Sequence, residues 1–174
     1  MKQAITYFLS LLAFAPFAQA QLTVNYLEPD EYKDIAYPTN RDDQKALNAV
    51  SKELNEKLAK LYEKNFGKEN PQPLELTFEE IDLAGEYEWW RVDLDDTRII
   101  KDIYPPRMVI SYKLKDDQGN VVSEGTKNLT DLGFQMTAGP RSNWENLYYE
   151  KELLEDFFNY ELRDAVKNKS VAQN

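Results

Sequence analysis

The stretch MVISYKLKDDQGNVVSEGTKNL, residues 108–129, decides the fold because it specifies two neighbouring strands of one sheet. Apolar and polar side chains alternate over residues 108–115, which is the period of a strand with one buried face. The sequence DDQGN follows at 116–120, and Gly119 suits the positive φ that tight turns require. Residues 121–129 then return along the first strand, so the stretch predicts an antiparallel hairpin.

A third strand is expected upstream of this hairpin. Residues 74–78 (LELTF) alternate in the same way, but the apolar phase slips by one residue before Ile81 and Leu83. One inserted residue near Glu79 and Glu80 would restore the alternation. We therefore expect a β-bulge at that point.

The N-terminal part predicts a strand followed by a long helix. Residues 22–27 (LTVNYL) alternate as a strand, and a helix over 41–66 can be capped by Asn40 or Asp42 and ended by Gly67. Because a crossover helix follows the first strand, that strand can pair parallel with the next one. The apolar stripe of this helix comprises Leu47, Val50, Leu54, Leu58, Leu61 and Tyr62.

A second helix is expected at the C-terminal end. Residues 130–143 contain two glycines and a proline and predict a loop, after which Asn143 can cap a helix from Trp144 to about Val166. Its apolar stripe comprises Leu147, Leu153, Leu154, Phe157, Phe158 and Leu162.

The order β-α-β-β-β-α predicts an α+β fold. We expect a twisted, mostly antiparallel sheet of about four strands, with both amphipathic helices packed on one face. The residues expected to share the core between helices and sheet are Leu54, Leu58, Phe78, Ile110, Leu154 and Phe157.

The first twenty residues have the three parts of a secretory signal peptide. Lys2 supplies a positive start, residues 4–15 form an almost unbroken apolar run, and Ala18-Gln19-Ala20 places small residues where a signal peptidase cleaves. The run is too short for a membrane-spanning helix, which needs about 20 apolar residues. We therefore expect cleavage after Ala20 and a periplasmic or secreted protein that is not inserted in a membrane.

The remaining chain predicts one domain and a short tail. Residues 21–166 are long enough to enclose a single core and contain no internal repeat or low-complexity linker. Residues 167–174 are polar and are expected to be a disordered tail.

The amino-acid composition limits the kinds of catalytic site, metal site and partner that are possible for this chain. The chain has no histidine and no cysteine, which excludes thiol nucleophiles, Cys/His zinc sites and Ser-His-Asp triads. Its formal net charge is −10, and nucleic acid and anionic membrane surfaces would repel it. Any catalysis would have to use carboxylates, lysine, tyrosine or a hard metal ion with oxygen ligands.

Five short segments distributed along the chain form a recognisable pattern. They are Tyr32-Lys33-Asp34-Ile35, Ile81-Asp82-Leu83-Ala84-Gly85-Glu86, Tyr104-Pro105-Pro106-Arg107, Leu129-Thr130-Asp131-Leu132 and the helical segment 149–158. Together they resemble a family of secreted bacterial proteins, the domain of unknown function 3016 family. The resemblance implies export and a shared fold, and it implies no activity, substrate or catalytic residue.

Residues 84–104 hold the candidate site. They have little periodicity and are expected to begin as a strand and continue as a long loop, a feature that is often functional in a compact domain. Adjacent tryptophans in an extended segment point to opposite faces, so one of them is expected at the surface, where tryptophan is common in binding hot spots. The alternative is that both pack as core and the charged residues face water. The candidate binding residues are Trp89, Trp90, Arg91, Asp93, Asp95 and Asp96.

The acidic part of this segment, Asp93, Asp95 and Asp96, is a candidate cation site. Carboxylates at close spacing can hold calcium, but a calcium loop starting at Asp93 would need glutamate at position 104, which is a tyrosine. Arg91 and Arg98 also flank the cluster and can neutralise it. We therefore predict no metal site and no cofactor.

Three functions stay open from the sequence. The favoured one is a non-catalytic envelope protein that binds another protein or a glycan. The second is a small metal- or carboxylate-dependent hydrolase acting on an envelope glycan or peptide, and the third is a structural or stress-related protein without a specific ligand. No catalytic residue is assigned, and the oligomeric state is not predicted.

Overall fold

The computed structural model describes residues 21–35, 43–66, 72–88, 90, 91, 93 and 97–163. The expected signal peptide at 1–20 and the expected tail at 167–174 lie outside these residues, as do the helix caps Asn40 and Asp42. Within the described part of the chain, no helix is long and apolar enough to cross a membrane.

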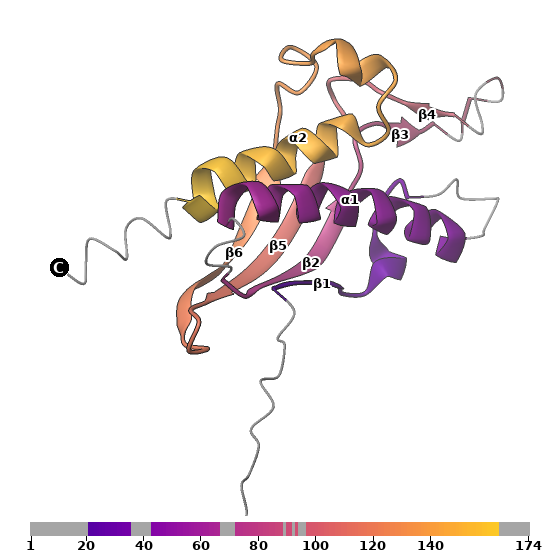
Figure 1. Ribbon diagram of the computed structural model, residues 1–174. Helices are drawn as coiled ribbons and strands as arrows, with labels where there is room; N and C mark the ends of the chain where they lie inside the picture. Colours follow the sequence, from indigo (N-terminus) through magenta and orange to yellow (C-terminus); the bar gives the residue numbers. More distant parts are fainter. Residues whose placement is uncertain are drawn as a thin grey trace, which may run out of the picture.

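Four strands form one mixed sheet in the order β1-β2-β5-β6 (Figure 1). Strand β1 runs parallel to β2, and the β2–β5 and β5–β6 pairs are antiparallel. The expected α+β fold with a mostly antiparallel sheet is therefore confirmed. The bounds are β1 Leu22–Tyr26, β2 Leu74–Asp82, β5 Arg107–Lys115 and β6 Val121–Thr130.

The bulge expected in β2 is present. Phe78 pairs with Ile110, but Glu80 pairs with Val109, so the register shifts across Glu79. The extra residue returns Ile81 to the helix-covered face, where it is fully buried.

Helix α1 (Asp43–Phe66) packs its predicted stripe on the sheet. Leu54 and Leu58 are fully buried in the core cluster, whereas Leu47 at the start of the stripe is only partly buried. Both long helices cross the same face of the sheet, as Figure 1 shows. The predicted core is confirmed, since Leu54, Leu58, Phe78, Ile110, Leu154 and Phe157 all belong to one buried cluster.

The C-terminal helix starts later than expected. Residues Pro140–Asn143 form the short 3-10 helix η2, and α2 spans Tyr148–Asp156. Leu147 has a left-handed backbone, with φ 53° and ψ 36°, so the chain cannot be helical from Trp144. The prediction that Asn143 caps this helix is wrong for that reason. Trp144 is 73% exposed and contributes little to the core.

The helix continues as a π-helical segment, η3 (Phe157–Leu162). Phe157 and Phe158 are both buried although they are adjacent, and their rings meet edge to face at 5.8 Å. A π-helical turn contains more residues than an α-helical turn, so it changes the direction in which the following side chains point. The segment keeps Leu162 on the buried face as well.

The described part of segment 84–104 contains a pair of short strands, where a strand followed by a long loop was expected. Strand β3 (Glu86–Tyr87) pairs antiparallel with β4 (Arg98–Ile99). Gly85 begins the hairpin with φ 85°, and a Cβ there would lie 2.7 Å from the Ile99 carbonyl oxygen. The sequence predicted a strand at the start of this segment but not β4, because a two-residue strand carries no readable period.

A candidate binding cleft beside helix α2

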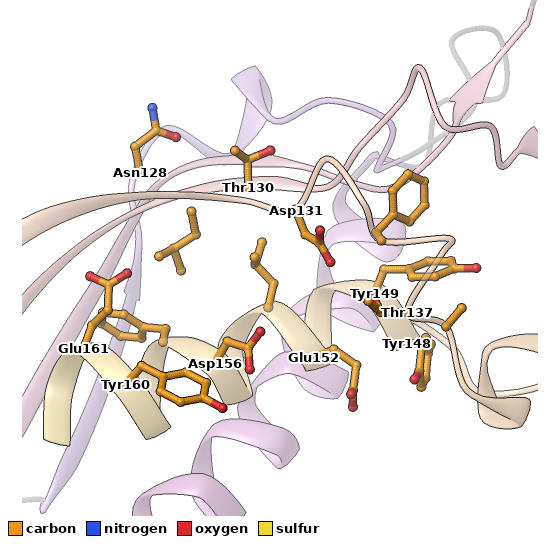
Figure 2. A pocket seen from close by; sticks show the side chains of 15 residues that line it. Asn128, Thr130, Asp131, Thr137, Tyr148, Tyr149, Glu152, Asp156, Tyr160 and Glu161 are labelled. Carbon is orange, nitrogen blue, oxygen red and sulfur yellow. The ribbon is translucent and has the colours of Figure 1, made fainter. Parts of the chain in front are cut away.

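A cleft of about 540 Å³ lies between the end of β6, the loop that follows it, and the outer side of α2 and η3 (Figure 2). Its floor includes Leu129, Leu153 and Phe157, which belong to the core. Hence the cleft is a hollow over packed apolar side chains with polar groups along its two walls.

One wall comes from β6 and residues 131–138. Asp131 follows the last residue of β6, and its Oδ1 accepts a 2.8 Å hydrogen bond from the Gly133 backbone N–H. This bond fixes the turn, and Figure 2 shows the carboxyl group directed into the cleft. Phe134 is buried below the loop and meets the ring of Tyr149 edge to face at 4.7 Å.

The other wall is a second stripe of the C-terminal helix. Tyr149, Glu152, Asp156 and Tyr160 follow one another at spacings of three and four residues, so they share one side of the helix. That side borders the core stripe and faces the cleft (Figure 2). Asp156 and Tyr160 are exposed, whereas Tyr149 and Glu152 are half-buried.

The rim of the cleft is held in place by Tyr148. Its hydroxyl accepts a 3.1 Å hydrogen bond from the Gly139 N–H, and the Arg141 guanidinium lies 5.5 Å from the centre of its ring. Arg141 also forms an ion pair with Glu152 at 3.1 Å. These contacts tie the loop to the helix and preorganise the opening.

The charges of the cleft are unevenly compensated. Glu161 pairs with Lys127 at 2.7 Å, and Glu152 pairs with Arg141. Among the described residues, no lysine or arginine forms an ion pair with Asp131 or Asp156. Loss of part of its hydration beside the cleft wall and the negative charges of Asp131 and Glu155 raise the pKa of Asp156 above its ordinary value.

Of the sequence-predicted site residues, the structure describes Trp90, Arg91 and Asp93, which lie between β3 and β4 and do not line this cleft. Trp90 is 52% exposed, in agreement with the expected surface tryptophan. Arg91 pairs with Asp93 at 3.1 Å and with Glu88 at 3.7 Å. Trp89, Asp95 and Asp96 lie outside the described residues, so the binding role of this segment stays a prediction.

Glu88 ties the base of the hairpin together. It is 2% exposed and forms a hydrogen-bonded ion pair with Lys101, while its Oε1 accepts a 3.2 Å hydrogen bond from the Tyr104 hydroxyl. The side chains that shield Glu88 from water, Lys101 and Arg91, are themselves partly exposed. The Lys101 ammonium lowers the pKa of Glu88, so this carboxylate is ionised and structural.

A second group of carboxylates lies where four segments of the family resemblance meet. Asp34, Asp82 and Glu86 line a hollow of about 290 Å³ together with Tyr104 and Thr130. Asp34 has φ 57° and its Oδ1 accepts a 3.2 Å hydrogen bond from the Tyr87 N–H, which supports the hairpin. The described residues include no group of three or more carboxylates placed to hold a metal ion.

The comparison with family models identifies the chain. A model described as Protein of unknown function (DUF3016) matches residues 20–160. The chain belongs to the DUF3016 family. The resemblance expected from the sequence is therefore confirmed, and the DUF3016 match covers both walls of the cleft as far as Tyr160. Neither the comparison with curated proteins nor that with solved structures gives a match.

The cleft of this DUF3016 protein was missed in the sequence. The acidic and tyrosine side chains at 149, 152, 156 and 160 lie outside the apolar stripe that the sequence predicts for this helix. Their helical spacing was visible, but the loop that faces them is not predictable from local periodicity. A search for a second stripe with tyrosine and acid at helical spacing could have found one wall.

Proposed function

We propose that this DUF3016 protein is a non-catalytic binding module that works outside the cytoplasm, in a periplasm or as a secreted protein. The signal-like pattern of residues 1–20 supports export. An envelope protein or an envelope glycan is the partner class that this location favours. The acidic net charge disfavours nucleic acid.

The observation that carries the proposal is the cleft beside α2. Binding sites are typically concave, with an apolar lining and a few placed polar groups. This cleft combines Phe134, Tyr149 and Tyr160 with the carboxylates of Asp131 and Asp156. Its volume of about 540 Å³ suits a small ligand or a short segment of a larger one.

Nuclear magnetic resonance with isotope-labelled protein tests the cleft directly. A basic peptide, an acidic peptide and a neutral oligosaccharide are titrated separately, and the backbone amide shifts of residues 131–138 and 149–160 are followed. At least one ligand class should shift these amides saturably. Thr137→Trp, at an exposed lining position, should fill the cleft and abolish the shifts.

The matched control is Asp117→Asn in the β5–β6 turn, at the other end of β6. It removes one exposed carboxylate without touching the cleft and should leave the shifts unchanged. If no ligand class shifts the cleft amides, or if Thr137→Trp leaves the shifts intact, the cleft is not the binding site.

The second candidate function is a carboxylate-dependent hydrolase. Asp131 and Asp156 face the cleft from opposite walls (Figure 2), and the raised pKa of Asp156 is the property that a general acid needs. Hydrolysis of envelope glycan by the purified protein that Asp156→Asn abolishes would establish this function. Product at the level of a blank without protein would exclude it.

A further inference from the structure

The geometry points to a basic peptide segment as the ligand, with one lysine or arginine side chain placed between Asp131 and Asp156. This inference rests on the proposed binding function of the cleft and adds the ligand class. It makes the partner a protein with an exposed basic segment, such as a terminus or loop. Binding of a neutral glycan in place of a peptide is one of the outcomes that the test distinguishes.

Charge complementarity carries the first step. Asp131 approaches from the loop and Asp156 from the helix, and no described lysine or arginine pairs with either. The other two carboxylates of the cleft already have partners, Arg141 for Glu152 and Lys127 for Glu161. An incoming cation would therefore meet two carboxylates that no described lysine or arginine compensates, and a charge-assisted hydrogen bond is stronger than a neutral one.

The aromatic lining carries the second step. Tyr160 lies about one turn after Asp156 and Tyr149 about two turns before it, on the same side of the helix. Lysine and arginine bury an apolar stem while the charged head reaches a polar group. Tyrosine rings can cover that stem, and the face of a ring attracts a cation.

The surroundings of the cleft favour a peptide over a sugar. The loop of residues 131–138 exposes Leu132 by 76% and Met136 by 92%, and Tyr160 is 62% exposed on the helix. Exposed apolar side chains beside a polar pocket are typical of protein-binding surfaces. Tyr160 lines the cleft and can contact an apolar residue beside the basic one, and Leu132 and Met136 are exposed on the loop that carries Asp131.

Fluorescence anisotropy with two labelled peptides tests the inference on the full-length protein. The first peptide is Leu-Gly-Arg-Gly-Leu, and the second replaces arginine by citrulline, which has nearly the same shape and no charge. We expect the citrulline peptide to bind about tenfold more weakly or worse. Added salt should weaken the arginine peptide more than the citrulline peptide.

Variants that each remove one carboxylate test whether Asp131 and Asp156 cause the difference in affinity between the two peptides. Asp131→Asn and Asp156→Asn should each weaken the arginine peptide by about tenfold, and the citrulline peptide much less. Asparagine at position 131 keeps an oxygen that can accept the Gly133 N–H, so the loop should stay folded. Asp117→Asn removes the same charge far from the cleft and should have no effect.

The outcomes separate the inference from the proposed function. Equal affinity for both peptides, or full affinity in both cleft variants, would overturn the basic-peptide inference while the cleft remains a binding site. A neutral oligosaccharide that shifts the cleft amides when neither peptide binds would also overturn the basic-peptide inference and leave the cleft as a binding site. If these two peptides, the acidic peptide and the oligosaccharide all fail to act at the cleft, the inference and the proposed function both fail.

Discussion

Glu150 is the most deeply buried carboxylate among the described residues, with 1% of its surface exposed. Its Oε1 accepts a 2.7 Å hydrogen bond from the backbone N–H of Ala84, which directly precedes Gly85 and the β3–β4 hairpin. One side chain thus joins α2 to the start of the hairpin. Burial raises the pKa of Glu150, and the positive charges of Arg98 and Lys151 oppose the rise.

This burial predicts a pH dependence that Glu150→Gln should remove. Because the folded-state pKa is raised, the contribution of Glu150 to stability is complete below the ordinary glutamate value of 4.5 and is lost as pH rises through the raised value. Glutamine resembles the protonated acid and can still accept the Ala84 N–H. The variant should be at least as stable as the wild type at neutral pH and should lack this slope, as measured by urea unfolding between pH 4 and 7.

Two further variants make that measurement specific. Glu150→Ala leaves the Ala84 N–H without its partner and should cost about 1–3 kcal/mol of unfolding free energy. Glu56→Gln, at an exposed position on α1, should change neither the stability nor its slope. A Glu150→Gln variant with the wild-type pH slope would show that Glu150 does not cause it.

At the scale of elements, the β3–β4 hairpin depends on one glycine. Gly85 and Gly119 both have φ 85°, but only Gly85 has neighbours where a Cβ would go, at 2.7 Å from the Ile99 carbonyl oxygen. Alanine substitutions at Gly119 and at Gly85 therefore separate the cost of backbone strain from the cost of steric overlap.

Gly119→Ala should cost about 1–2 kcal/mol, which is the price of a left-handed non-glycine residue, and Gly85→Ala should cost more. Chemical denaturation gives both values. Amide hydrogen exchange should also become faster in residues 86–87 and 98–99 of the Gly85→Ala variant alone. Equal losses in the two variants would show that the contact with Ile99 can relax.

The packing of the helices on the sheet is tested by truncation. Leu58 on α1 and Phe157 on η3 are 0% and 1% exposed and belong to the same core cluster. Leu58→Ala and Phe157→Ala should each reduce the unfolding free energy by about 2–5 kcal/mol. Lys60→Ala on the exposed side of α1 serves as the control and should be nearly neutral. Unchanged stability in both core variants would contradict the helix faces described above.

The segment between β3 and β4, which contains the predicted binding residues, remains a second candidate for binding. We expect a Trp90→Ala, Asp95→Ala double variant to lose partners in a pull-down from envelope extract if this segment binds. Its folding is checked by circular dichroism, and Thr137→Trp is run beside it to report on the cleft. Recovery of the same partners by the wild type and the hairpin variant would exclude the hairpin as the binding surface.

At the scale of the whole molecule, the proposed export is tested by processing. The protein expressed in a bacterial host is expected to begin at Gln21 in the periplasmic fraction, because Ala18 and Ala20 suit signal peptidase. Intact-mass spectrometry measures the N-terminus. Ala20→Arg should block cleavage and leave the precursor in the membrane fraction. A mature protein that still contains Met1 or Lys2 would contradict the prediction.

The sequence alone determined the sheet strands, the bulge at Glu79 and the core stripe of each helix. Each of these follows from side chains close together in the chain, because a buried face imposes a period of 2 on a strand and 3.6 on a helix. The α+β class followed from the order of those elements. The family was also recognisable at this level, through short segments distributed along the chain.

Only the tertiary structure decided where α2 begins, that β3 and β4 pair, that Glu150 is buried and that a cleft exists. Leu147 is left-handed in the folded chain, although its apolar side chain fits a helical stripe. Asp131 and Asp156 are ordinary solvent-facing residues by their own periods, and they share a cleft because β6 and the C-terminal helix bring their segments together. Local periodicity records which side of an element is buried, but not which distant segment lies opposite its polar side.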